Sequence, residues 1–224
     1  MAEITLNLAH MDLLIELPEG VSADPKLLDG GHPLHYVLKM KGQTQTYLNC
    51  VHRLLCDLPK GLKVVELCAG IGLVARTNVN DLQPSDWLGI ELDQSCMPLF
   101  KQIAPWARFC LGDMYDFQPD SDIGLMICEF SNNTLPKMWL GHKRAALLER
   151  IAMARPRYWY IADVGYYWIH LPNHWPIYEA KFGVKPTREN YADLFDRYVR
   201  ENLGYKVVNW TVGGGAQYFM LESV

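Results

Sequence analysis

The residues best suited to chemistry lie in and directly after the run KVVELCAGIGLVA, residues 63–75. Two valines are followed by an acid, Glu66, and then by small residues that include Gly70 and Gly72. This order predicts a buried strand, a tight turn and the start of a helix. Glycines let the backbone approach a ligand closely, and the free N–H groups of a first helical turn point at it. The run therefore indicates a nucleotide-like cofactor site, although a plain strand-to-helix turn without a ligand has the same pattern.

Acids also follow the other apolar runs of the chain. One acidic side chain stands at or just after each of five such runs: Glu66, Glu91 with Asp93 close behind, Asp113, Glu129 and Asp163. In a parallel sheet the carboxyl ends of the strands meet at one edge, where ligands bind. Because a buried carboxylate needs hydrogen-bond partners, we expect this series of acids to face the polar groups of a ligand.

The alternation of apolar segments predicts an α/β fold with a doubly wound, mostly parallel, seven-stranded sheet. Strands are expected at 63–68, 87–92, 107–111, 123–128 and 158–162. Helices are expected at about 72–80, 94–104, 136–154 and 187–203. Two further β-like runs, YKVVNWTV and AQYFMLES, flank three consecutive glycines at 213–215 and predict a C-terminal antiparallel hairpin.

The chain is expected to have an N-terminal extension, residues 1–58, packed on a main domain, residues 59–224. Within the extension, residues 3–17 partly alternate between apolar and polar, which favours short strands or a hairpin. Residues 44–58 have apolar side chains at helical spacing. Residues 164–186 are rich in aromatic residues and proline and are too long for a simple connection, so we expect a lid or substrate wall there.

Composition limits the class of protein. The chain has 224 residues and a net charge of -4, which gives no support for tight electrostatic binding to nucleic acid. None of its six cysteines forms a C-x-x-C pair, so we expect reduced thiols in a cytoplasmic protein. No apolar run reaches the length of a membrane span, and no signal peptide is recognisable. The sequence leaves the oligomeric state open.

Taken together, these residues resemble the class I S-adenosylmethionine-dependent methyltransferases, a Rossmann-like family, over about residues 60–163. The glycine motif of that family is usually acid-x-Gly-x-Gly-x-Gly. The matching positions are Glu66, Cys68, Gly70 and Gly72, so a cysteine replaces the first glycine. This replacement fits the motif if the backbone at Cys68 does not need a positive φ. The resemblance implies S-adenosylmethionine as the cofactor.

The resemblance also implies which residues hold the methionyl end of the cofactor. Glu66 would reach its ammonium group, through water. The loop that runs from Cys68 and Ala69 to Gly70 and Gly72 would surround it.

The adenosine end would lie against the next two strand ends. By resemblance, the carboxylate of Glu91 would accept hydrogen bonds from the two ribose hydroxyls. Asp113 would accept from the adenine amino group, while the N–H of Met114 donates to the ring. Leu92 and Met114 would enclose the adenine from its two faces. Glu129 is expected to complete the contacts to the cofactor.

The acceptor is expected to bind beyond the fourth and fifth strands. Methyl transfer aligns the acceptor with the methyl group and removes a proton where the acceptor requires it. Glu129 and Asp163 are the candidate catalytic acids. Candidate substrate-binding residues follow them in the sequence: Phe130, Asn132, Tyr166, Tyr167 and Trp168. The two acids also resemble part of the metal site of some O-methyltransferases, but Val164 replaces an asparagine of that site, so we predict no metal.

Several alternatives remain at this point. Gly70-x-Gly72-x-x-Ala75, with Glu91 following 19 residues after Gly72, also fits the fingerprint of NAD(P)-binding oxidoreductases. A small-molecule acceptor, methylated on oxygen or nitrogen, is the favoured reading. An RNA or DNA methyltransferase is a second reading, although the Asp/Asn-Pro-Pro-aromatic motif of the amino-methylating DNA enzymes is missing at 129–132. A non-catalytic cofactor-binding subunit is a third.

Overall fold

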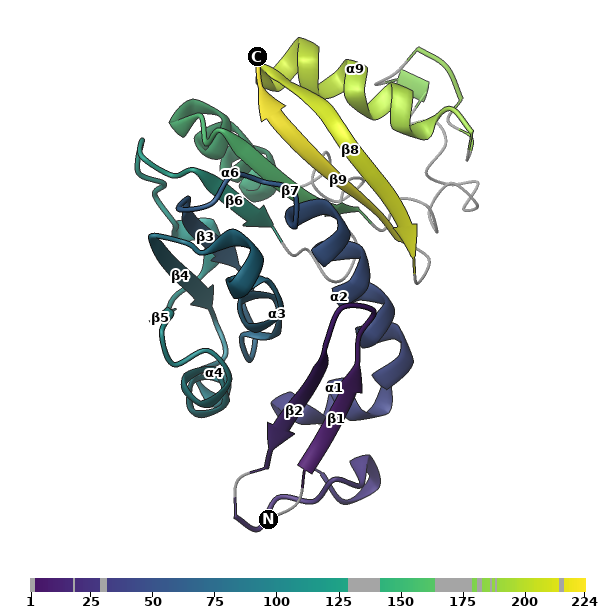
Figure 1. Cartoon of the computed structure of the whole chain (residues 1–224). Helices are drawn as coiled ribbons and strands as arrows, with labels where there is room; N and C mark the ends of the chain where they lie inside the picture. The colour runs from purple at the N-terminus through teal and green to yellow at the C-terminus, as the bar shows by residue number, and fades with distance from the viewer. Residues whose placement is uncertain are drawn as a thin grey trace.

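The computed structural model describes residues 3–17, 19–28, 32–128, 142–163, 179–180, 183–185, 187, 189–213 and 216–224, with only the backbone at 36, 142–145 and 163. Within these ranges, seven strands form one sheet in the order β5-β4-β3-β6-β7-β9-β8 (Figure 1). Their bounds are β3 (Lys63–Leu67), β4 (Asp86–Glu91), β5 (Arg108–Leu111), β6 (Leu125–Cys128), β7 (Tyr158–Asp163), β8 (Tyr205–Gly213) and β9 (Ala216–Ser223). The first five are parallel, whereas β9 is antiparallel to both β7 and β8. The predicted sheet and its closing hairpin are confirmed.

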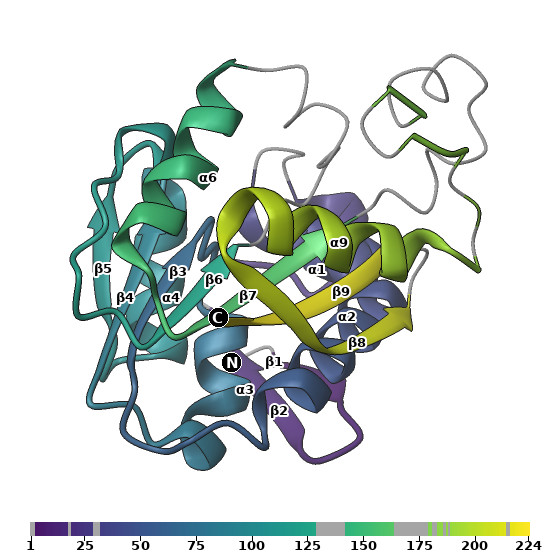
Figure 2. The same ribbon diagram turned by 90° about the horizontal axis from the view of Figure 1, so that it is seen from above.

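Helices cover both faces of this sheet, which explains why consecutive residues of the central strands β3 and β6 are buried. Val64 packs into the core beneath α3 (Leu73–Leu82) and α4 (Met97–Ile103). The next residue, Val65, packs into the core beneath α6 (His142–Ala154) and α9 (Tyr191–Leu203). Figure 2 shows α6 and α9 on one face of the sheet and α3 on the other. No helix in the described ranges combines the length and the apolar character needed to cross a membrane.

The N-terminal residues form the predicted hairpin, with β1 (Glu3–Asn7) antiparallel to β2 (Asp12–Glu16). Their side chains alternate strictly between exposed and buried, and the inward residues join the core beneath α3 and α4. The predicted helix is α2 (Lys41–Leu55), which begins and ends three residues earlier than expected and packs against α3 and β8. Two short elements were missed, η1 (Pro25–Leu27) and α1 (Pro33–Lys39), because they are too short to give a helical period.

The division of the chain at residue 58 stays a prediction, as does the lid at 164–186, most of which lies outside the described residues. Elsewhere the observed elements differ from the expected ones by a few residues at their ends. The predicted helix at 94–104 begins as a 3-10 turn, η2 (Gln94–Cys96), before α4. Asp93 caps this turn by accepting a hydrogen bond from the N–H of Ser95, and Pro98 then stands in the first turn of α4, where no N–H is needed.

Candidate cofactor site at the carboxyl edge of the sheet

The loop between β3 and α3 lies where the strand order changes direction. β4 and β5 lie on one side of β3, and β6 and β7 on the other, so the carboxyl ends of β3 and β6 flank the topological switch point. Three of the loop's residues have positive φ: Cys68 at 59°, Gly70 at 52° and Gly72 at 83°. The loop is anchored by the N–H of Ala69, which donates to the carbonyl of Ile90 on β4 over 3.1 Å.

The two glycines of the loop have different surroundings. A Cβ at Gly70 would meet nothing within 4 Å, so the backbone there is open to a ligand. A Cβ at Gly72 would lie 3.0 Å from the ring of Phe100, so that glycine allows α3 to pack against α4. Only Gly70 therefore has the open space that the predicted cofactor contact requires.

Cys68 does not meet the condition under which a cysteine fits the glycine motif without strain. Its φ of 59° is in the left-handed region, where a side chain with a Cβ is strained. Its Sγ lies 3.3 Å from Sδ of Met114, which follows β5, two strands away from β3 in the sheet. The loop thus carries a thiol that contacts a predicted adenine-binding residue.

This strain leads to a prediction for substitutions at Cys68. Valine should destabilise the protein by about 2 kcal/mol more than alanine does, because a β-branched side chain suits positive φ least. Glycine should be the most stable of these three variants. Urea unfolding of the Cys68→Gly, Cys68→Ala and Cys68→Val proteins measures the order. A valine variant as stable as the glycine variant would contradict the left-handed conformation.

The carboxylate of Glu91, at the end of β4, is the centre of the site's hydrogen bonds. Its Oε2 accepts from the N–H of Gly70 over 2.9 Å. Its Oε1 accepts from the N–H groups of Leu92 and Asp93 over 2.8 and 3.0 Å. A carboxylate has about four acceptor positions, so about one is left for a ligand. Glu91 therefore shapes the loop as well as offering a ribose contact, a double role that its sequence position did not indicate.

Glu66, which is predicted to reach the cofactor's ammonium group, makes a hydrogen bond inside the core. It is 1% exposed, and its Oε2 accepts a hydrogen bond from Nε1 of Trp87 over 2.9 Å. One carboxylate oxygen is thus used inside the core. The predicted contact between Glu66 and the cofactor's ammonium group stays a prediction.

The predicted adenine residues lie at the end of β5. Asp113 caps the 3-10 turn η3 (Met114–Asp116), with its Oδ1 accepting from the N–H of Tyr115 over 2.9 Å. Met114 is partly buried against the core beneath α6. Leu92, by contrast, is 69% exposed, as expected of an apolar side chain that a bound ring would cover.

One contact to this turn was missed by the sequence analysis. Arg150 on α6 donates from Nη2 to the carbonyl of Tyr115 over 2.5 Å and so joins η3 to α6. No local signal in the sequence distinguishes Arg150 from the other basic residues of this helix. Its role depends on a contact between residues 35 positions apart.

The structure describes no side-chain geometry for the remaining predicted site residues. Glu129, Phe130, Asn132, Tyr166, Tyr167 and Trp168 lie outside the described residues. Asp163 ends β7 at the expected sheet edge, with its backbone alone described. Among the described residues, no three His, Cys, Asp or Glu side chains are placed to share a metal ion. All six cysteines lie in the described ranges, and each is a free thiol.

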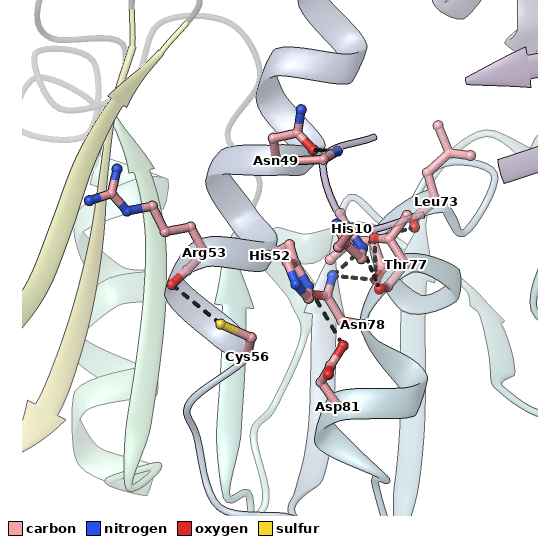
Figure 3. A network of polar contacts seen from close by, with 11 residues as sticks. His10, Asn49, His52, Arg53, Cys56, Leu73, Thr77, Asn78 and Asp81 are labelled. Carbon is pink, nitrogen blue, oxygen red and sulfur yellow. Dashed lines mark hydrogen bonds and ion pairs between the residues drawn. The ribbon is translucent and has the colours of Figure 1, made fainter. Parts of the chain in front are cut away.

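A second polar cluster connects the N-terminal hairpin to the helix that follows the loop. The rings of His10, in the hairpin turn, and His52, on α2, stack at 3.4 Å with an angle of 7° between them (Figure 3). Nε2 of His10 lies 3.1 Å from the carbonyl of Thr77 on α3. Nδ1 of His52 lies 3.3 Å from Oδ1 of Asn78, whose Nδ2 donates to the carbonyl of Val74. Both histidines are therefore donors to α3 through these nitrogens.

The stacked pair makes stability depend on pH. Burial of its ring and the neighbouring His52 lower the pKa of His10, while the Thr77 carbonyl and Asp81 act in the opposite direction. The folded state then binds fewer protons than the unfolded chain. This stabilisation is complete above the unfolded pKa of about 6.5 and is lost as the pH falls below it.

We therefore expect a lower urea midpoint at pH 5.5 than at pH 7.5. The matched control is His10→Phe, which keeps an aromatic ring for stacking but cannot be protonated. Its midpoint should fall less between the same two pH values. Equal decreases in the two proteins would show that His10 is not responsible.

Comparison with known proteins gives matches in structure alone. Neither a comparison with protein-family models nor one with curated proteins finds a match. The magnesium protoporphyrin IX methyltransferase ChlM of Synechocystis, crystallised with S-adenosylhomocysteine, is 12% identical at a TM-score of 0.58, with 84% of this chain and 88% of ChlM covered. A TehB-like S-adenosylmethionine-dependent methyltransferase of Corynebacterium glutamicum is 17% identical at 0.53, with 87% and 99% covered.

TrmN of Thermus thermophilus is 18% identical at a TM-score of 0.50, with 79% of this chain covered. The chain spans about half, 48%, of the length of TrmN. The two other matches span most of both chains. The protein has the fold of the class I S-adenosylmethionine-dependent methyltransferases, as its resemblance to them predicted.

Proposed function

We propose that this protein, which has a class I methyltransferase fold, binds S-adenosylmethionine and transfers its methyl group to a small molecule. The observation that carries the proposal is the loop from Cys68 to Gly72. It has three positive φ angles, is open at Gly70 and is joined to the Glu91 carboxylate by a backbone N–H. The hydroxyl groups of a ligand suit the remaining acceptor position of the carboxylate, and a carboxylate group of a ligand suits backbone N–H groups at the start of a helix.

The chain's own residues would bind and orient the cofactor, which supplies an electrophilic methyl group when bound. Glu91 would accept from a ribose hydroxyl at its remaining position, while keeping the loop in place through Gly70. Asp113 would accept from the adenine through Oδ2, since its Oδ1 caps the turn. Leu92 would cover a face of the ring. Glu129 and Asp163 remain the proposed bases for an acceptor that must lose a proton.

Strand order favours this reading over a dinucleotide enzyme. Dinucleotide-binding sheets have the order 3-2-1-4-5-6. Here the position beyond β7 is taken by β9, which is antiparallel and inserted before β8. The glycine fingerprint and Glu91 fit both families. The strands beyond β7, namely β9 and β8, are therefore what distinguishes the two families here.

Two observations support a small-molecule acceptor. The net charge of -4 gives no general attraction to a phosphate backbone. ChlM, which matches most of the chain in structure, is by its name a methyltransferase of a porphyrin. The O- or N-methylation expected from the sequence is part of this proposal.

A radiolabel experiment tests turnover and the acceptor class together. The protein is incubated with S-adenosylmethionine tritiated on its methyl group, and with either a protein-free small-molecule extract or total RNA. We expect S-adenosylhomocysteine and labelled product from the small-molecule extract alone. Label in RNA would overturn the acceptor class, and bound cofactor without turnover in either pool would favour a non-catalytic subunit.

A further inference from the structure

Gln217 is a buried amide at the sheet edge where the acceptor is expected. It is the second residue of β9 and is 1% exposed. It pairs in register with Asp163, the last residue of β7, and with Val212 on β8. Because β7 is parallel to β3 and β6, its last residue marks the carboxyl edge of the sheet. Gln217 therefore lies at the ligand edge, on the strand beyond β7.

The described residues that share the face of this amide on β9 are apolar. Alternate residues of a strand share a face, so Gln217 is on the same face as Phe219 and Leu221, both fully buried. The ring of Phe219 packs at 4.3 Å from that of Phe195 on α9. An apolar side chain at position 217 would continue this packing, so the fold alone gives no reason for an amide there.

The side-chain oxygen of Gln217 is also unsatisfied. Within the described part of the chain, this buried Oε1 has no hydrogen-bond partner. A buried polar group without a partner costs about 1–3 kcal/mol. Native proteins contain few such groups, and those that persist call for a specific explanation such as a ligand. The position of Gln217 at the ligand edge of the sheet indicates that this ligand is one that binds at the proposed site.

The strand order places this amide on the acceptor side of the site. The proposed adenosine contacts, Glu91 and Asp113, follow β4 and β5 on one side of β3. Gln217 lies on the other side, beyond β6 and β7. A group transferred near the switch point must be received by a molecule that approaches from the β6–β7 side.

We propose that Gln217 positions the methyl acceptor by hydrogen bonding to an uncharged polar group of it, such as a hydroxyl or an amide. A glutamine side chain both donates and accepts, and it carries no charge to compensate an anion in an apolar setting. The assignment rests on the proposed function and adds to it a residue and a chemical class of acceptor.

Gln217→Met tests the assignment, because methionine matches the shape of glutamine and removes the amide. Thr211→Val is the control: it removes a buried hydroxyl from β8, at a residue that pairs with Tyr218 on β9. Each protein is measured for melting temperature, for S-adenosylhomocysteine affinity by calorimetry, and for tritiated methyl transfer to the small-molecule extract.

We expect Gln217→Met to melt no lower than the wild type and to bind S-adenosylhomocysteine with an affinity within about twofold of it. Methyl transfer should fall at least about tenfold. A tenfold fall corresponds to about 1.4 kcal/mol, as expected for the loss of one hydrogen bond. Thr211→Val should retain transfer. Wild-type transfer by Gln217→Met, or a clear drop in its melting temperature, would overturn the assignment.

The remaining outcomes are also decisive. A wild-type protein that does not bind S-adenosylhomocysteine contradicts the proposed function, and the assignment falls with it. If the wild type binds but labels nothing in the extract, the melting temperature decides. A Gln217→Met protein of equal or higher stability supports an amide kept for a ligand, and a less stable one shows that the amide is structural.

Discussion

Replacing Glu91 by alanine is expected to raise the dissociation constant for S-adenosylhomocysteine at least about thirtyfold, a loss of roughly 2 kcal/mol. The carboxylate accepts from the N–H of Gly70, Leu92 and Asp93, so its removal frees the loop and deletes the proposed ribose contact. Hydrogen bonds to a charged group contribute about 1.5–3 kcal/mol each, so the loss of one ligand contact alone accounts for an effect of this size. Isothermal calorimetry measures it directly.

Asp93→Ala is the matched control for this experiment. Asp93 is an acid that lies two residues after Glu91. Its carboxylate accepts hydrogen bonds from the hydroxyl and the N–H of Ser95, and these bonds lower the pKa of Asp93. These bonds make it the N-cap of η2. We expect an affinity within about threefold of the wild type, as for loss of a cap of about 0.5 kcal/mol. Similar losses in the two variants would mean that the ribose contact has been misplaced.

Gly89→Ala should give the largest loss of stability among single substitutions near the site. Gly89 lies on β4, where a Cβ would come within 2.8 Å of the Cβ of Ala69 and of the ring of Phe100. The Cβ of Ala69 is fixed to the backbone of the loop, so the clash must displace the loop itself. Overpacking of this kind typically costs 1–3 kcal/mol, and we expect about 3 kcal/mol by urea unfolding.

Gly112→Ala provides the comparison. Gly112 follows β5 at the same edge, and a Cβ there would meet only Ile90, at 3.9 Å. We expect its free energy of unfolding to stay within about 0.5 kcal/mol of the wild type. Gly89→Ala should also weaken S-adenosylhomocysteine binding, since Ala69 must move. A Gly89→Ala protein with the stability of the wild type would show that β4 and the loop are not in close contact.

The sheet could be predicted because its central strands have a strong local signal. Apolar runs such as those of β3 and β6, alternating with helical periods, indicate parallel strands buried on both faces. The run of glycines at 213–215 marks the closing hairpin in the same local way. The 3-10 turn η1 and the helix α1 were missed for the opposite reason: three and seven residues contain too few turns for a period to be recognised.

The site was less predictable, because its side chains are directed by residues that are far apart in the sequence. Glu66 ends a strand as expected, but the indole of Trp87, 21 residues later, draws one oxygen into the core. The positive φ of Cys68 accompanies an anchor between Ala69 and Ile90, which no local pattern reveals. Arg150 likewise gained its significance only from the carbonyl of Tyr115. The sequence indicated that polar residues lie at the carboxyl edge of the sheet. The tertiary contacts decide which of these side chains face a ligand.

The central claim is that the loop from Cys68 to Gly72 binds a sulfonium nucleoside and not a dinucleotide. The most direct test is the melting temperature of the wild-type protein with S-adenosylmethionine, S-adenosylhomocysteine or NAD, each at the same concentration. A ligand that binds only the folded state stabilises it by about 2.7 kcal/mol at one hundred times its dissociation constant. We expect the first two ligands to raise the melting temperature and NAD to leave it unchanged. A rise with NAD alone would contradict the account.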